Sequence, residues 1–569
     1  MNKQSEIEKL KAEVERLKKE LKKRKKYGLV WEDKPEEVVE MCKEKLPVLK
    51  EIKDKEIITD KNKPVNLLIE GDNYHALSVL NYTHAGKVDV IYIDPPYNTG
   101  NEGFKFNDRV VDREDAYRHS KWLSFMNSRL RLAKKLLNTN GIIFISIGDT
   151  EVSNLRLLMD EIFGEQNFIS IVPRLAKTSS DKGTFFAPSK DFVLVYKSLG
   201  RTELFHDVLD EKYTERFKYK DVNGPFAIVG LYQAALDPMR GCSNQRYFIK
   251  CPDGSLVIPP GHTMPREKRD GAHIPPRDKN DKVWRWTYST YFKNKSLLVF
   301  KKSKNSPLID SKGRQSEWNI YTKYYLKDRY ETGKRPRDWI EKYPNTLGSV
   351  ELRKMNIDFS YPKPTALIKY LISISCRKKN AIILDFFAGS GTTGHAVLEL
   401  NKEDGGNRQF ILCTNNENNI CTDVCYPRIK KVIEGYKNLK GEQIEGLGGN
   451  LKYFRTDFVD AEPSDKNKIK LTKQATEMLC IKEGTFKKVV DNERFKIFKN
   501  SDHYTGIIWD QTAIPEFKKE IKDIKGKFSV YIFSLGDETF DEEFADLKQK
   551  VKLSPIPEAI LRVYRRIFR

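Results

Sequence analysis

The sequence predicts an α/β fold organised around a doubly wound parallel sheet, and three observations support this prediction. Short apolar runs rich in β-branched residues, such as residues 88–93, are typical of buried parallel strands. Between residues 63 and 200 they alternate with stretches that have helical spacing, such as 122–137. The alternation returns near residue 358 after a long interruption. Strands and helices in this rhythm indicate a sheet with helices on both faces.

Length and composition limit the possible classes of protein. A chain of 569 residues has room for roughly three to four domains. Hydrophobic residues make up 39% of it, which is enough to build cores and excludes wholesale disorder. Lysine and arginine number 102 against 80 acidic residues, a formal charge of +22. Such an excess indicates a polyanionic partner, with solubility charge as the alternative.

The cysteines and the apolar runs indicate a reduced, cytoplasmic protein. The eight cysteines are scattered, and only Cys421 and Cys425 lie close together. The sequence has no second pair of cysteines at the spacing of metal ligands. We therefore expect Cys421 and Cys425 to pack on one face of a helix and not to bind a metal. No run approaches about 18 apolar residues and the first residues are charged, so we expect neither a membrane span nor a signal peptide.

Residues 1–62 form the first expected segment. A capping box at residues 5–8 begins a helix whose apolar residues follow at spacings of three and four. This spacing predicts a short coiled coil, or else one amphipathic helix lying on its own domain. The apolar positions are Ile7, Leu10, Val14, Leu17 and Leu21.

Residues 63–200 are the first half of the expected core. A strand over 66–72 ends at Asp72 and precedes a helix over 73–80, so Asp72 should lie at the same sheet edge as the end of the strand at 88–93. The remaining elements expected here are a helix at 122–137, a strand at 141–149, a helix at 155–163 and a strand at 192–196.

The strand at 88–93 runs into Asp94-Pro95-Pro96-Tyr97. Two prolines cannot donate to a sheet ladder and hold Asp94 out of the helical region, so the strand must stop there. The Asp94 carboxylate and the Pro95 carbonyl can each accept one N–H of an exocyclic amine, and the Tyr97 ring can stack on a heterocycle. A tight turn in which Tyr97 merely packs is the alternative.

Residues 201–350 interrupt the rhythm. Proline, glycine, arginine and aromatic residues are frequent there, as in Trp284-Arg285-Trp286. Basic side chains interleaved with rings suit a nucleic-acid surface, with an irregular scaffolding insert as the alternative.

Residues 351–450 are the second half of the core. A strand over 382–387 contains Asp385 and precedes a glycine-rich turn over 388–394, after which a helix begins. Such a turn lets a ligand approach the backbone and the helix N-terminus. A nucleotide phosphate loop is rejected because no lysine follows Gly391. Glu417, past the next strand at 410–414, is placed to bind ribose hydroxyls, although Asn415 and Asn416 are rivals.

Residues 451–569 are expected to form a small α+β interaction domain. It begins with a strand near 452–458 and ends in a basic amphipathic helix over 557–569.

With both motifs described, the chain resembles the β-class DNA amino-methyltransferases, in which Asp-Pro-Pro-Tyr precedes Phe-x-Gly-x-Gly. Here residues 94–97 come first and 387–391 follow nearly 300 residues later. This resemblance implies a circularly permuted, Rossmann-like methyltransferase sheet with a target-recognition domain inserted between its halves. Asp94 before Pro-Pro-Tyr is similar to the adenine-N6 members more than to the cytosine-N4 members.

Within that class the chain is most similar to the Mod subunits of type III restriction-modification systems. Lys190-Asp191 departs from the family, which often has His followed by an acidic or polar residue, and this weakens any role for position 190. The stretches that carry the likeness are 27–32, 284–286, 361–364, 451–459 and 556–561.

The resemblance also implies roles for individual residues. The corner of Asp94, Pro95, Pro96 and Tyr97 would hold a flipped adenine. The cofactor would be S-adenosylmethionine, with Glu417 at its ribose and Asp72 lining the cofactor or target cavity. Lys363 and Thr365 would lie beside the same pocket. The residues expected around the methionine part are Asp385, Phe387, Gly389 and Gly391.

The resemblance thus implies an adenine-N6 methyltransferase acting on double-stranded DNA. It further implies a homodimer and a helicase-nuclease Res subunit as partner. The alternatives are a cytosine-N4 enzyme, an RNA or protein methyltransferase, and a non-catalytic DNA-binding specificity subunit. Two intact motifs beside a large basic insert favour the DNA enzyme.

Overall fold

A computed structural model describes residues 29–60, 63–100, 104–178, 185–206, 214–332, 335–500, 503–536 and 538–568. The coiled coil expected over residues 7–21 lies outside them. The chain divides into two compact units, of which one comprises Met1–Leu204 and Arg337–Arg569 and the other Phe205–Pro336. The second unit falls within the expected insert, 201–350.

A ten-stranded sheet forms the centre of the first unit. Its order is β1 (Lys45–Glu51), β21 (Asn450–Asp460), β3 (Val65–Glu70), β18 (Gln409–Thr414), β17 (Ile382–Asp385), β4 (Val88–Ile93), β7 (Leu137–Ile147), β9 (Lys190–Lys197) and β8 (Phe168–Leu175), with β2 (Ile57–Ile58) paired to β21. The six strands from β21 to β7 are parallel, which confirms the predicted α/β class. The outer strands β1, β9 and β8 are antiparallel, which the apolar pattern did not indicate.

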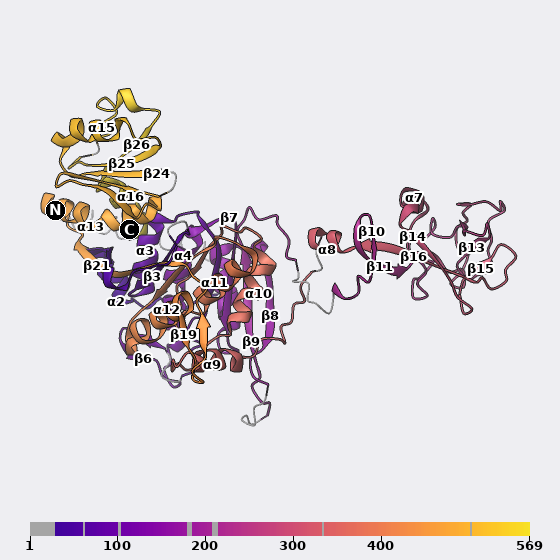
Figure 1. The fold of residues 1–569 in the computed structure, drawn as a ribbon. Coiled ribbons are helices and arrows are strands. Elements are labelled where there is room, and N and C mark those ends of the chain that lie inside the picture. The colour runs from indigo at the N-terminus through magenta and orange to yellow at the C-terminus, as the bar shows by residue number, and fades with distance from the viewer. Residues whose placement is uncertain are drawn as a thin grey trace, which may run out of the picture. The chain divides into compact units, whose positions relative to one another are not determined.

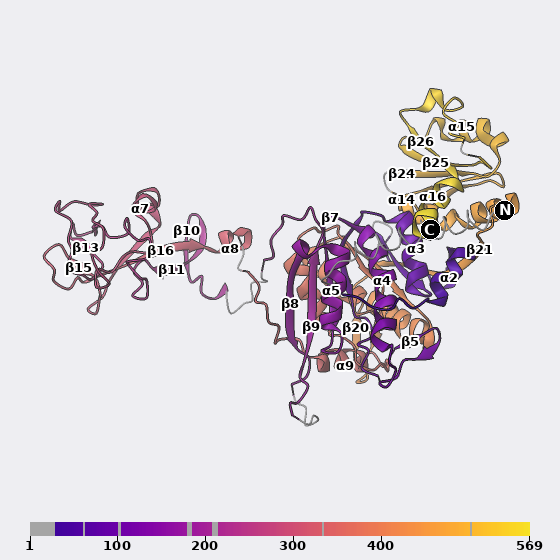
Figure 2. The same ribbon diagram turned by 180° about the vertical axis from the view of Figure 1, so that it is seen from behind.

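Helices cover both faces of this sheet. In Figure 1 the near face carries α10 (Thr365–Ser375), α11 (Thr392–Asp404) and α12 (Tyr426–Glu434). Figure 2 shows α4 (Arg118–Leu136) and α5 (Val152–Phe163) on the other face, and α3 (Asn73–Thr83) packs beside α4. Smaller elements complete the unit: α2 (Glu37–Glu44), β5 (Lys105–Phe106), β6 (Arg109–Val110), α9 (Asn345–Lys354), β19 (Gly435–Lys437) and β20 (Gln443–Glu445).

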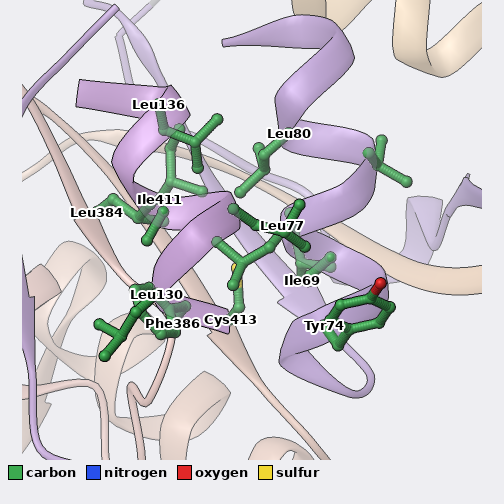
Figure 3. Close-up of a cluster of buried hydrophobic side chains, with 14 of the residues drawn as sticks. Ile69, Tyr74, Leu77, Leu80, Leu130, Leu136, Leu384, Phe386, Ile411 and Cys413 are labelled. Atoms are coloured by element: carbon green, nitrogen blue, oxygen red, sulfur yellow. The ribbon is translucent and has the colours of Figure 1, made fainter. Parts of the chain in front are cut away.

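The core lies where α3 and α4 meet the middle of the sheet. Figure 3 shows Leu77 of α3, Leu130 of α4 and Leu384 of β17 in one cluster of side chains, and all three are fully buried. Burying each such side chain contributes roughly 1.5–3 kcal/mol, which is why apolar residues recur every three or four positions in both helices.

The chain leaves the middle of the sheet in opposite directions from two neighbouring strands. After β17 it crosses through α11 to β18, and after β4 it crosses through α4 to β7 on the other side. At such a switch point the connections diverge beyond the carboxyl ends of the strands and leave a crevice for ligands. The Asp94 corner and the glycine-rich turn are the segments that follow these two strands.

The C-terminal residues form a second sheet in the same unit. The core sheet extends past the boundary expected at residue 451, because β21 pairs with β3 in parallel. Beyond it come α13 (Asp465–Gln474), α14 (Thr476–Glu483), β22 (Lys487–Asp491), β23 (Phe495–Lys499), β24 (His503–Ile508), α15 (Ile514–Lys522), β25 (Lys527–Phe533), β26 (Val551–Ile556) and α16 (Glu558–Ile567). The hydroxyl of Tyr564 in α16 donates to the Pro47 carbonyl of β1, so this helix packs on the core.

The second unit contains two small sheets. One has the order β10 (Tyr219–Asp221), β11 (Gly224–Gly230), β16 (Trp318–Tyr325) and β14 (Leu298–Lys302), and the other β12 (Ile249–Lys250), β13 (Leu256–Ile258) and β15 (Ile309–Asp310), with helices α7 (Tyr288–Lys293) and α8 (Leu326–Thr332). Trp284, expected on a binding surface, is instead fully buried, and its indole N–H donates to the Tyr247 carbonyl at 2.8 Å. Across the described part of both units, no helix is long and apolar enough to cross a membrane.

Candidate active site

The carboxylate of Asp94 follows the end of β4, and only one of its two oxygens accepts a hydrogen bond from the described residues. Asp94 Oδ2 accepts a hydrogen bond from the Lys363 ammonium at 2.6 Å. Oδ1 is buried and has no hydrogen-bond partner among the described residues. A buried acceptor left unpaired is costly and therefore marks a place where a donor is expected to bind.

The two prolines differ in what their carbonyls contact. The Pro96 carbonyl accepts the indole N–H of Trp122 at 2.7 Å, which anchors the corner to α4. The Pro95 carbonyl accepts no hydrogen bond from any residue that the structure describes. Asp94 Oδ1 and the Pro95 carbonyl are therefore two acceptors on neighbouring residues that receive no hydrogen bond from the described residues.

The Tyr97 ring is held in place by a hydrogen bond from its hydroxyl to a buried ion pair. Its hydroxyl donates to Asp191 Oδ2 at 3.3 Å, and the buried guanidinium of Arg174 donates to both oxygens of Asp191, at 2.7 and 2.5 Å. A Cβ at Gly148 would lie 2.9 Å from the ring, so only glycine fits there. Burial, reinforced by the Asp94 charge, raises the pKa of the Tyr97 hydroxyl well above its usual range, so the phenol is neutral.

A buried carboxylate that the sequence did not single out supports the residue after the motif. Asn98 has a φ of 52° and its amide donates to Glu151 Oε1 at 2.5 Å. The fully buried Glu151 also contacts His119 Nδ1 at 2.6 Å and accepts from Asn154 at 2.7 Å. An acidic residue at the start of a helix is an ordinary sequence feature, so no pattern distinguished this one.

Asp385 at the end of β17 is engaged inside its own turn. Oδ1 accepts the Phe387 N–H at 3.0 Å, and the Thr393 hydroxyl donates to Oδ2 at 2.5 Å. Burial raises the pKa of this carboxyl to about 7. Both oxygens hold the loop together, and the contact between Asp385 and a cofactor that the family resemblance implies stays a prediction.

The two glycines of the turn differ in their surroundings. Gly391 has a φ of 79°, and a Cβ there would lie 3.1 Å from Cys425 Sγ. Gly389 has a φ of 49°, and a Cβ there would lie 3.6 Å from the Phe359 ring and 3.9 Å from the Phe387 carbonyl oxygen, both ordinary contact distances. Gly391 is therefore packed closely against the protein, while the surroundings of Gly389 are less crowded.

A fully buried arginine, also missed in the sequence, joins the turn to its neighbours. One terminal nitrogen of Arg428 donates to Ser390 Oγ at 3.0 Å and Thr392 Oγ1 at 2.8 Å. The other donates to Thr365 Oγ1 at 2.9 Å and lies 3.3 Å from Glu351 Oε2. Thr365 is thereby part of the support of the glycine turn.

The two motifs are adjacent in space. Strands β17 and β4 pair in parallel, with Leu384 opposite Ile91. Lys363 joins the segments that follow them, because its ammonium binds Asp94 and its carbonyl accepts the Thr392 hydroxyl at 3.2 Å. The corner and the glycine turn thus lie side by side at the carboxyl edge of the sheet.

Two other expected cofactor residues lie at the same edge of the sheet. Glu417 forms an ion pair with Lys105 and its side chain is 40% exposed. Asp72 caps α3 through the Tyr74 N–H at 2.7 Å and accepts from Arg129 at 3.2 Å. No cluster of side chains suited to a metal ion occurs among the described residues.

Known proteins resemble this chain over the same region. A family model described as DNA methylase matches residues 88–423. The StyLTI Mod subunit of a type III restriction-modification enzyme from Salmonella typhimurium is 34% identical over 61% of this chain and 52% of its own length. The type II methyltransferase M.KpnI of Klebsiella pneumoniae is 30% identical over 66% of this chain and 89% of its own.

The chain spans only 52% and 58% of the lengths of two Mod relatives, the second being the EcoPI Mod subunit of Escherichia phage P1. Among solved structures, an M1.HpyAVI–SAM complex aligns with 64% of this chain at 16% identity and a TM-score of 0.28. These Mod relatives confirm the resemblance drawn from the motifs. The region matched by the family model contains both the Asp94 corner and the glycine turn, and the chain belongs to the DNA methylase family.

Proposed function

We propose that this protein transfers a methyl group from S-adenosylmethionine to the N6 amine of adenine in double-stranded DNA. The observation that carries the proposal is the unpaired Oδ1 of Asp94 beside the Pro95 carbonyl. Together these acceptors match the two N–H groups of an exocyclic amine, and the Tyr97 ring supplies a face for the base.

The proposed role of the Asp94 corner is to accept hydrogen bonds from the amine and to orient it. Accepting both N–H bonds draws electron density onto the amine nitrogen and directs its lone pair away from Asp94. Lys363 holds Oδ2, so the carboxylate keeps one orientation and acts as an acceptor rather than as a strong base. Most of the acceleration would come from orienting two bound reactants.

The glycine turn suits the proposed cofactor. Gly389 has no side chain and a Cβ there would meet no atom closer than 3.6 Å, so a ligand could approach the backbone closely just before the N-terminus of α11. When bound, S-adenosylmethionine supplies the electrophilic methyl group. Glu417 would accept hydrogen bonds from the ribose hydroxyls, and Asp72 would line the crevice. Asp385 and Phe387 would shape the turn, with Lys363 and Thr365 beside it.

The second unit would hold the DNA. On its larger sheet Tyr219 stacks on Phe226 with ring centroids 5.5 Å apart, and Lys301 and Lys323 lie over these rings at 4.6 and 4.7 Å. Cations and rings on one sheet suit phosphates and bases. By analogy with its Mod relatives, the chain would act in the cytoplasm as a homodimeric modification subunit with a Res partner.

The test is a comparison of the wild-type chain with Asp94→Asn, which keeps the shape of the side chain. Duplex DNA and methyl-labelled S-adenosylmethionine are the substrates, and mass spectrometry of the nucleosides identifies the product. Wild type should yield N6-methyladenine, whereas the variant should lose at least 100-fold in rate with cofactor affinity unchanged by calorimetry. A product of N4-methylcytosine, a preference for RNA, or no labelling would each contradict the proposal.

A further inference from the structure

Two adjacent aromatic side chains stand in solvent on the connection between β8 and β9. Phe185 is 92% exposed and Phe186 91%. Phenylalanine is usually among the buried residues, so two consecutive rings with almost no protein contact need an explanation. The next residues, Ala187 and Pro188, are exposed as well.

This connection leaves the sheet at the edge where the candidate active site lies. Strand β9 runs antiparallel to β7 with Phe192 opposite Ile147, the last residue of β7. Because β7 is parallel to β4, the start of β9 and the end of β4 share one edge. Figure 2 shows the coloured parts of the connection, which are the residues described, leaving the sheet beyond the ends of β8 and β9.

The base of the connection is tied to the active-site corner. Leu175 pairs with Lys190, and the N–H groups of Ala176 and Lys177 donate to the Ser189 carbonyl at 2.8 and 3.0 Å. Asp191, next in the chain, accepts the Tyr97 hydroxyl at 3.3 Å. The two ends of the connection are therefore hydrogen-bonded to each other, and the β9 end is linked through Asp191 to the residue proposed to stack on the target base.

A lysine lies on each side of this base. Lys177 and Lys190 are both exposed where the connection leaves the sheet, and Lys190 Nζ lies 3.9 Å from Oδ1 of the exposed Asp149. Ammonium groups in these places suit the phosphates of two strands, and an exposed ion pair as long as that of Lys190 costs little to exchange for a phosphate. Cations at the base and apolar rings beyond them favour a duplex as the occupant over an apolar protein groove.

We propose that Phe185 and Phe186 form a wedge that enters the base stack of duplex DNA where the target base is extruded. The inference rests on the proposed function, since it assumes a base that swings out to the Asp94 corner. An aromatic ring in the vacated space replaces the lost stacking and slows the return of the base. The wedge lowers the cost of extrusion without contacting the reacting atoms, so both phenylalanines are positioning residues.

The test uses the full-length chain and the double variant F185A/F186A. A matched control is Leu199→Ala, because Leu199 is 76% exposed just past the opposite end of β9. Sequencing of modified bases in plasmid DNA methylated by the wild type supplies the target site. Two short synthetic duplexes then carry that site, one fully paired and one with a mismatch opposite the target base.

On the paired duplex the double variant should lose on the order of 10- to 100-fold in kcat/KM, while Leu199→Ala matches wild type. On the mismatched duplex, where extrusion is already easier, the loss should shrink to less than about 3-fold. Cofactor affinity should stay unchanged in all variants.

The outcomes separate the two proposals. A wild-type chain that labels no DNA overturns the proposed function and the wedge together. A double variant that equals wild type on the paired duplex, or loses the same factor on both duplexes, overturns the wedge alone. If light scattering shows that the double variant changes only the state of self-association, the rings join copies of this chain and the wedge is again wrong.

Discussion

The Lys363 ammonium lies 2.6 Å from Asp94 Oδ2 although 269 residues separate the two in the chain. The lysine side chain is only 8% exposed, so the ion pair is largely shielded from water. This contact commits one carboxylate oxygen and leaves the other for a ligand. It is also a direct contact between the Asp94 corner and the segment that precedes the glycine turn.

Replacing Lys363 by methionine should lower the free energy of unfolding by about 2 kcal/mol, because it leaves a partly buried carboxylate without its partner. Lys363→Arg should lose less. Urea denaturation measures both changes, and a double-mutant cycle with Asp94→Asn isolates the energy of the pair. A coupling energy near zero would show that the two residues are neighbours without mutual stabilisation.

Asp385 should make stability depend on pH. Its pKa in the folded chain is about 7, above its ordinary value of 3.8, so between these values the folded chain holds a proton that the unfolded chain has lost. Its contribution to stability is therefore complete below pH 3.8 and lost as the pH rises through 7. The difference in unfolding free energy between wild type and Asp385→Asn should thus fall by about 1 kcal/mol per pH unit over this range.

Urea denaturation from pH 4.5 to 8.5 measures this difference. Thr393→Val serves as the control, because the Thr393 hydroxyl lowers the pKa of Asp385. Removing it should move the pH-dependent range upward. A difference between wild type and Asp385→Asn that stays constant with pH would show that Asp385 is ionised throughout.

The sequence predicted those parts of the site whose backbone conformation only a few residue types, such as proline and glycine, can adopt. Two prolines after an apolar strand force a corner, and glycines after another strand force an open turn, so both motifs were located correctly. The parallel centre of the sheet followed from apolar runs that leave no polar face. Strand direction at the edge did not follow, because an apolar pattern is the same for a parallel and an antiparallel strand.

The residues that support the site could not be predicted in this way. Arg428 lies in α12, which also holds the basic residues Lys430 and Lys431, and the sequence of an amphipathic helix does not distinguish a buried arginine from an exposed one. Glu151 and the Arg174–Asp191 pair are equally ordinary in sequence. Each becomes significant only when the fold brings donors from distant segments to it.

Glu417 offers a test that separates ligand binding from stability. Its ion pair with Lys105 is about 40% exposed, so Glu417→Gln should change the unfolding free energy by less than about 0.5 kcal/mol. If Glu417 accepts the ribose hydroxyls, the Kd for S-adenosylmethionine should rise about 10-fold in calorimetry. Lys105→Met frees the same carboxylate and should leave the Kd unchanged or lower. An unchanged Kd in Glu417→Gln would remove this residue from the cofactor site.

Arg428 should affect both the fold and the site. Its fully buried guanidinium donates from two nitrogens to three segments: the glycine turn with Ser390 and Thr392, α9 with Glu351, and α10 with Thr365. Burial lowers the pKa of this arginine to about 10. Lysine offers a single ammonium that cannot span these partners, so Arg428→Lys should cost about 3 kcal/mol of unfolding free energy.

The matched control for Arg428→Lys is Lys430→Ala, an exposed change in the same helix that should cost less than about 0.5 kcal/mol. Where Arg428→Lys remains folded, its cofactor affinity and its methylation rate should both fall. The reason is that the glycine turn and the segment that carries Lys363 are fastened by the same side chain. If Arg428→Lys loses stability but keeps its cofactor affinity and its methylation rate, Arg428 stabilises the fold alone. Lys363 would then be positioned by its contacts with Asp94 and Thr392, without help from Arg428.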